Sequence, residues 1–149
     1  MQERMNIDEA EPRIYKAMDA SEKQLAAFGL EKKLVELVKL RASQVNGCGY
    51  CVNLHSKDAR KAGETEQRVY AVSAWWETPF FTPAEQAALK LAEEITRIAE
   101  GGLSEETYQK ALQHFGKTGV AQLIFTIVVT NSWNRLAISM HMVAEQDKN

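Results

Sequence analysis

The chain has 149 residues, of which 45% are hydrophobic, enough for one globular domain with a core of its own. Its 18 basic and 20 acidic residues give a formal charge of −2, and without a basic excess we expect no binding to nucleic acid. The first residues contain no apolar segment after a basic start, so we predict a cytoplasmic location. The longest apolar stretch, residues 120–129, is about half of a membrane span, so we interpret it as buried core and expect no membrane partner.

Apolar residues recur at helical spacing along the chain, and no segment has the alternation typical of a strand. Turn signals divide these stretches: Gly29, the pair Asn46-Gly47, and the aromatic loop 77–85, which holds two of the three prolines. We expect helices over residues 14–28, 31–44, 48–62, 66–76, 83–99, 105–115 and from about 118 past 136. The sequence therefore predicts one all-α domain over residues 1–149, a bundle of about seven helices with a few loose residues at each end.

Two thiols and an imidazole lie close together in the helix expected over residues 48–62. Cys48 and Cys51 are three positions apart, and His55 follows Cys51 by four, so all three side chains project from one face and can touch. Because Asn46-Gly47 ends the preceding helix, Cys48 falls in the opening turn of the next one, where the helix dipole favours a thiolate. Lowering a thiol pKa from about 8.5 to about 6 raises the ionised fraction at pH 7 roughly thirtyfold. Paired cysteines in a reducing compartment are usually catalytic or transient, which favours thiol chemistry here.

An acid on the preceding helix is placed to meet the imidazole. Glu36 lies roughly 15 Å before the turn along its helix, and His55 lies about 10 Å beyond Cys48 along the next one. If the two helices pack side by side, Glu36 contacts His55. We therefore hypothesise a relay in which Glu36 orients and polarises His55, His55 takes the proton of Cys51, and Cys48 then closes a disulfide.

The pattern Glu-x(11)-Cys-x-x-Cys-x-x-x-His, on two consecutive helices, resembles the alkylhydroperoxidase D (AhpD) branch of the carboxymuconolactone decarboxylase-like family. The resemblance covers residues 34–75 by motif. It extends to the late helix, which carries Asn131, Trp133, Asn134 and Arg135 and is similar to the C-terminal part of short family members.

This resemblance implies an all-helical fold that assembles as trimers or hexamers, and a thiol-dependent peroxidase in antioxidant defence. Cys51 would be the attacking thiol and Cys48 the resolving one, while His55 and Glu36 fill the positions of the family's histidine and acid. The partners implied are a small hydroperoxide, a dithiol or protein reductant, and further copies of the chain. No cofactor is implied.

Tyr50 is the one departure from the motif of the best-studied branch, which carries a second histidine just before its second cysteine. Many short relatives share a tyrosine at this place. Tyr50 is therefore a candidate accessory residue, with two interpretations: its hydroxyl donates a hydrogen bond to the site, or its ring only packs.

Other interpretations of the cysteine pair compete with redox chemistry. The two thiols could be inert core residues. A zinc site needs four ligands, and the other two imidazoles, His114 and His141, lack the spacing of such a site, so we expect no metal. A thioredoxin motif follows a strand, which is not predicted here, and covalent haem needs a histidine where Val52 stands.

Two rival functions remain beside the peroxidase. One is a redox-responsive interaction protein, whose disulfide changes its binding to a partner without fast turnover. The other is the cofactor-free decarboxylase or lactone chemistry of family members that generally lack the cysteine pair.

Two further groups are assigned no catalytic role. The aromatic residues near the 77–85 loop are expected in the core, at a subunit contact or at a substrate entrance rather than around a cofactor: Trp75, Trp76, Phe80 and Phe81. The polar residues of 131–135 follow an apolar helical stretch, so we expect them to be paired at an interface, outside the site.

Overall fold

The structure, a computed structural model that describes residues 2–146, is a bundle of α-helices without a strand among those residues. The described residues form seven α-helices: α1 (Ile7–Ala10), α2 (Pro12–Ala27), α3 (Lys32–Asn46), α4 (Gly49–Lys61), α5 (Glu66–Ala71), α6 (Pro83–Thr96) and α7 (Glu105–Met140). Two 3-10 segments follow α5 and α6, at Val72–Glu77 and Ile98–Glu100. The predicted all-α class is confirmed.

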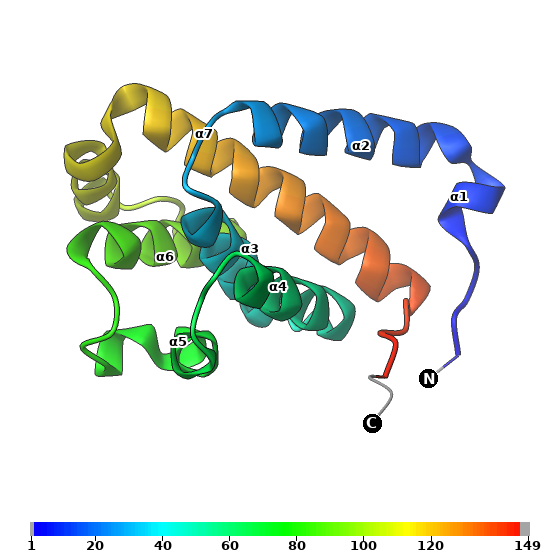
Figure 1. Cartoon of the computed structure of the whole chain (residues 1–149). Helices are drawn as coiled ribbons and strands as arrows, with labels where there is room; N and C mark the ends of the chain where they lie inside the picture. The colour runs from blue at the N-terminus through cyan, green and yellow to red at the C-terminus, as the bar shows by residue number, and fades with distance from the viewer. Residues whose placement is uncertain (1, 147–149) are drawn as a thin grey trace.

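Helix α3 is the centre of the bundle and packs against α4, α6 and α7 (Figure 1). One side of α3 contributes Leu34 and Val38 to a core shared with α6 and α7. The adjacent side contributes Leu37 and Leu40 to a second core, which is shared with α4, the α5 region and α6. Burying two sides holds α3 firmly in place, and Glu36 is carried on this helix.

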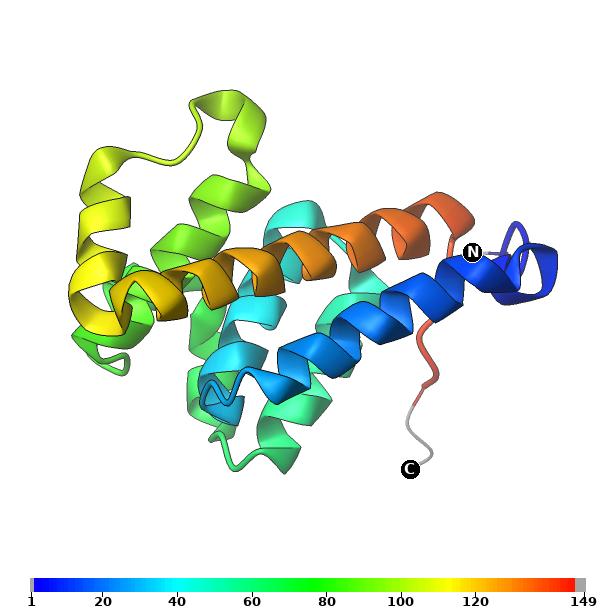
Figure 2. The ribbon, with the colours of Figure 1, turned by 90° about the horizontal axis from the view of Figure 1, so that it is seen from above.

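Helix α7 spans the molecule, and α2 runs beside its second half (Figures 1 and 2). Its two predicted parts form one element that turns sharply at Gly116, whose φ of 63° lies in the left-handed region that glycine adopts easily. Figure 2 shows the first part of α7 pointing away from the long second part. The break expected from Gly116 is therefore present.

Residues 4–10 have more regular structure than the sequence suggests. Helix α1 is not predicted, because four residues are too few to show a periodicity. It begins after Asn6, whose side chain accepts hydrogen bonds from the backbone amides of Asp8 and Glu9. The amide of Arg4 donates to the carbonyl of Met140 at 2.9 Å, so this segment is attached to the end of α7.

The apolar stretch 120–129 is buried on one side only, which corrects the interpretation that it is core throughout. Leu123 and Ile127 are fully buried, whereas Phe125 and Val128 are 37% and 46% exposed. The reason is that α7 packs against other helices on one side and meets solvent on the other. No described helix combines the length and the apolar character needed to cross a membrane.

The aromatic residues near the 77–85 loop divide between core and surface. Trp75 and Phe81 are buried in the second core, with Phe80 packed against it, while Trp76 is exposed. Trp75 also donates its indole N–H to Glu93, 2.9 Å away. Three of the four residues therefore belong to the core.

Buried amides connect the C-terminal end of α3 to α7. Asn134, which is fully buried, accepts a bond from the Asn46 side chain at 2.8 Å and donates to the Ser43 hydroxyl at 3.1 Å. Asn131 also accepts from Asn46, at 2.9 Å. These polar groups of α7 are thus paired, as expected, but their partners lie in the same chain and not at an interface.

Replacing Asn134 by alanine should destabilise the fold. The change removes the bonds of Asn134 to Asn46 and to the Ser43 hydroxyl and leaves a cavity at a fully buried position, so we expect the free energy of unfolding to fall by about 2 kcal/mol. Urea denaturation measures this value. Gln113→Ala, on the exposed side of the same helix, is the control and should change it by less than about 0.5 kcal/mol. An equally small loss of unfolding free energy for Asn134→Ala would contradict a structural role for this hydrogen-bond network.

Candidate active site

The turn between α3 and α4 fixes the first cysteine at a helix start. Gly47 has a φ of 69°, and its amide donates to the carbonyls of Ser43 and Gln44, which ends α3 in the usual left-handed conformation. Cys48 then caps α4, and its Sγ accepts a hydrogen bond from the Cys51 amide at 3.3 Å. A thiolate of Cys48 would therefore be stabilised both by this amide and by the helix dipole.

Cys48 and Cys51 are joined by a disulfide, with their Cα atoms 5.3 Å apart. Their spacing on one helix face brings them together, as the sequence predicts. Both are almost completely buried, with exposed fractions of 1% and 4%. Neither sulfur is available for a zinc ion in this state.

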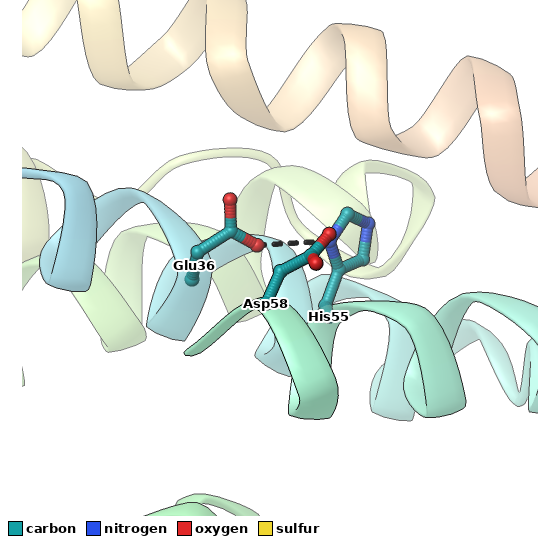
Figure 3. A group of neighbouring side chains, drawn as sticks. All are labelled: Glu36, His55 and Asp58. Carbon is teal, nitrogen blue, oxygen red and sulfur yellow. Dashed lines mark hydrogen bonds and ion pairs between the residues drawn. The ribbon is translucent and has the colours of Figure 1, made fainter. Parts of the chain in front are cut away.

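Glu36 and His55 form a largely buried pair across α3 and α4 (Figure 3). Glu36 Oε2 lies 3.0 Å from His55 Nδ1. Because a carboxylate only accepts, we assign the ring proton to Nδ1, which leaves Nε2 as the basic nitrogen. The expected contact is therefore present. Lys39, which neighbours Glu36 on α3, binds Glu22 instead.

A cavity of about 290 Å³ lies beside this pair, and Cys51 and His55 both line it. One part of its wall is charged, with Glu22, Glu36, Lys39 and Asp58. Another part is aromatic or apolar, with Tyr15, Leu54, Trp133, Ala137 and Met142. Cys51 is thus the cysteine that shares a cavity with the imidazole.

Cys48 lines a different cavity, of about 480 Å³, between the start of α4 and the segment after α7. Its wall includes Gly49, Ile138 and Val143. Tyr50 lines both cavities and packs against the two cysteines. The structure therefore places Tyr50 at the site, and whether it acts there stays a prediction.

Tyr15 and Trp133 are cavity residues that sequence reasoning missed. Their rings meet edge to face with centroids 5.3 Å apart. Burial, followed by the nearby Tyr50, raises the pKa of Tyr15, so its phenol stays protonated at neutral pH. Trp133 was expected outside the site, and its position corrects that expectation. Tyr15 lies in α2, and nothing in its local sequence indicates a site.

A network of hydrogen bonds extends from Trp133 along the cavity wall. The indole N–H of Trp133 donates to Glu22 Oε1 at 3.1 Å, and Lys39 Nζ donates to Glu22 Oε2 at 2.8 Å. Both oxygens of the Glu22 carboxylate are therefore occupied. The side chain of Lys39 is only 9% exposed, so its charge is neutralised mainly by Glu22.

Glu36, His55 and Asp58 each offer a ligand atom, and these atoms lie within 4.8 Å of one another. Figure 3 shows the two carboxylates beside the imidazole. A cation held by all three would have to compete with the hydrogen bond between Glu36 and His55 Nδ1. The geometry alone does not make this group a metal site, and the absence of a metal stays a prediction.

The all-helical fold, with a Cys-x-x-Cys pair at a helix start and a Glu–His pair beside it, defines an AhpD-like protein. The model of the carboxymuconolactone decarboxylase family matches residues 12–94, more than half of the chain. The chain belongs to this family.

Particular relatives support this assignment. An uncharacterised protein of Bacillus subtilis (strain 168), YdfG, is 40% identical over 140 residues, which cover 94% of this chain and 95% of that protein. The alkyl hydroperoxide reductase AhpD of Hyphomonas neptunium is 42% identical over 43 residues, 29% of this chain and 24% of that protein.

Solved structures match the whole fold. A protein of unknown function from Agrobacterium tumefaciens, suggested to be an antioxidant defence protein AhpD, superimposes with a TM-score of 0.96 at 34% identity and covers 98% of this chain and 100% of its own. The debrominase Bmp8 superimposes with a TM-score of 0.82 at 21% identity, covering 91% of this chain and 73% of its own. At that identity the second match supports the fold alone.

Proposed function

We propose that the protein is a thiol-dependent peroxidase that reduces small hydroperoxides in antioxidant defence, using Cys51, Cys48, His55 and Glu36. The observation that carries the proposal is that Cys51 and His55 line one cavity while Cys48 lies within bonding distance of Cys51. A substrate can therefore approach a cysteine that already has both a base and a resolving thiol beside it.

The first step oxidises Cys51. His55 Nε2 takes the thiol proton, and the thiolate sulfur attacks the terminal oxygen of the hydroperoxide. The O–O bond breaks, the alkoxide takes the proton back from His55 and leaves as an alcohol, and Cys51 becomes a sulfenic acid. Glu36, bound to Nδ1 at 3.0 Å, holds the ring in the required tautomer and stabilises its protonated form.

The second step forms the disulfide. The Cys48 sulfur attacks the sulfenic sulfur, the S–O bond breaks, and the oxygen leaves as water with the Cys48 proton. An external dithiol then returns two electrons and two protons to the pair and is itself oxidised to a disulfide. When Cys51 is attacked in this reduction, Cys48 leaves as a thiolate at the helix start, where negative charge is stabilised.

Peroxide consumption by the parent protein tests the function. The reduced protein, with tert-butyl hydroperoxide and excess dithiol, should consume many equivalents of peroxide per chain, and the first equivalent should remove two thiols. Dithiol without protein is the control. A single slow oxidation would favour the redox-responsive interaction protein instead. Two thiols that stay free and unreactive would identify a structural pair and contradict the proposal.

We also propose that the chain forms a homo-oligomer, a trimer or hexamer. Apolar side chains on the outer side of α7, Phe125 and Val128, and the indole of Trp76 are exposed in the single chain and would be covered by a second copy. Light scattering after size exclusion measures the mass. A monomer at micromolar concentration would contradict this assembly.

A further inference from the structure

The charged part of the cavity beside Cys51 carries more acid than base. Three carboxylates line it, those of Glu22, Glu36 and Asp58, together with the ammonium of Lys39. Lys39 is bonded to Glu22 at 2.8 Å and is nearly buried, so it offers little free positive charge to a ligand. A ligand carboxylate placed here would lose its hydration shell next to like charges.

The carboxylates of this wall are themselves occupied. Glu36 accepts from His55, and both oxygens of Glu22 accept bonds from Trp133 and Lys39. The Lys61 ammonium, 3.0 Å from Asp58, is largely exposed, so water screens that pair. The wall therefore remains acidic as a whole.

The cavity has the size for a small ring, and part of its lining is apolar. Tyr15 and Trp133 form a corner of two rings at 76°, and Leu54 and Met142 extend the apolar surface. The volume of about 290 Å³ is at the small end for ligand pockets and corresponds to roughly ten water-sized groups. An aromatic hydroperoxide of about ten heavy atoms is therefore of suitable size.

We infer that this cavity selects small, uncharged hydroperoxides with an apolar, preferably aromatic, group, and that Glu22 rejects carboxylate-bearing ones by neutralising Lys39. The inference rests on the proposed peroxidase function and specifies its substrate class. Removing the charge of Glu22 would leave the Lys39 ammonium free to pair with a ligand carboxylate. Glu22 is thus the residue that determines selectivity by charge.

A pair of matched substrates tests the inference. The para-carboxamide and the para-carboxylate of cumene hydroperoxide are nearly equal in size and differ in charge, and kcat/KM for each is measured with the same dithiol. We expect the parent protein to prefer the neutral peroxide by at least about tenfold, about 1.4 kcal/mol. Glu22→Gln keeps the shape and still accepts from Trp133, and it should reduce this preference at least about fivefold.

Glu106→Gln is the matched control, since it removes the same charge from an exposed residue of α7 that pairs with Lys110 and does not line this cavity. It should leave the preference unchanged. Equal use of the two peroxides by the parent protein, or equal shifts in both variants, would overturn the inference.

Binding to the disulfide form separates this inference from the peroxidase proposal. The alcohol products of these two peroxides are titrated by ligand-observed NMR, which needs no turnover. The parent protein should bind the neutral alcohol more tightly, and Glu22→Gln should reduce this preference. That result supports the selectivity even if no peroxide is consumed. Turnover of peroxide with equal affinities for the two alcohols and equal kcat/KM for the two peroxides would overturn the selectivity. The proposed peroxidase function would still stand.

Discussion

Replacing Cys51 by serine is expected to abolish peroxide turnover, with a loss of at least about thousandfold in kcat/KM. Cys51 is the thiol that shares a cavity with His55, and a hydroxyl in its place is a far weaker nucleophile at neutral pH. Cys48→Ser should behave differently. Without external dithiol it should still react with the first equivalent of peroxide and then stop, because no second thiol is present to release water from the sulfenic acid.

The two cysteine variants are matched controls for each other, because both lose the disulfide and both replace one buried sulfur by oxygen. Rates of first oxidation are measured by stopped-flow mixing with tert-butyl hydroperoxide. The rate should be far higher in Cys48→Ser, which keeps the attacking thiol, than in Cys51→Ser. Melting temperatures compared with the reduced parent protein show whether both are folded. Equal first oxidation in the two variants would contradict the assignment of Cys51 as the attacking thiol.

Glu36→Gln should lower kcat/KM about a hundredfold at pH 7. Glutamine keeps the size of the side chain but removes the charge that stabilises protonated His55, and its amide can turn to donate to Nδ1 and fix the wrong tautomer. The deficit should shrink as pH rises toward the ordinary thiol pKa of about 8.5, because hydroxide then replaces the base. The measurement is kcat/KM from pH 6 to 9.

Asp58→Asn is the comparison for this variant. Asp58 is a carboxylate on the same cavity wall, but it pairs with Lys61 rather than with the imidazole. Asp58→Asn should lower kcat/KM less than Glu36→Gln does, and its deficit in kcat/KM should not shrink at high pH. If both variants lose the same activity with the same pH profile, the effect belongs to local charge, and the specific role of Glu36 is wrong.

The geometry at the cysteines could be predicted from local sequence, because it follows from helix periodicity and one turn. The positions of Cys48, Cys51 and His55 on α4 are fixed by the rise and twist of a single helix. The contact with Glu36 required only that α3 and α4 fold back on each other, and Gly47 provides that tight turn. The catalytic roles of these residues remain predictions.

The part of the cavity lining that comes from α2 and α7 could not be predicted in the same way. Tyr15 and Glu22 are on α2, and Trp133 is on α7, so their approach depends on how two helices far apart in sequence pack together. Trp133 and Asn134 are neighbours, yet one lines the cavity and the other bonds to the end of α3. Successive helix residues point about 100° apart, so treating them as one polar group hid the difference.

The measurement that tests the central claim most directly is mass spectrometry of Cys48→Ser after one equivalent of cumene hydroperoxide in the presence of dimedone, which traps sulfenic acids. The account predicts one dimedone adduct per chain, located on Cys51, and no adduct in Cys51→Ser treated in the same way. Either of two results would contradict it. One is an adduct on Cys48 in Cys51→Ser that forms as fast as the expected adduct on Cys51, and the other is an unmodified Cys51 in the folded Cys48→Ser variant.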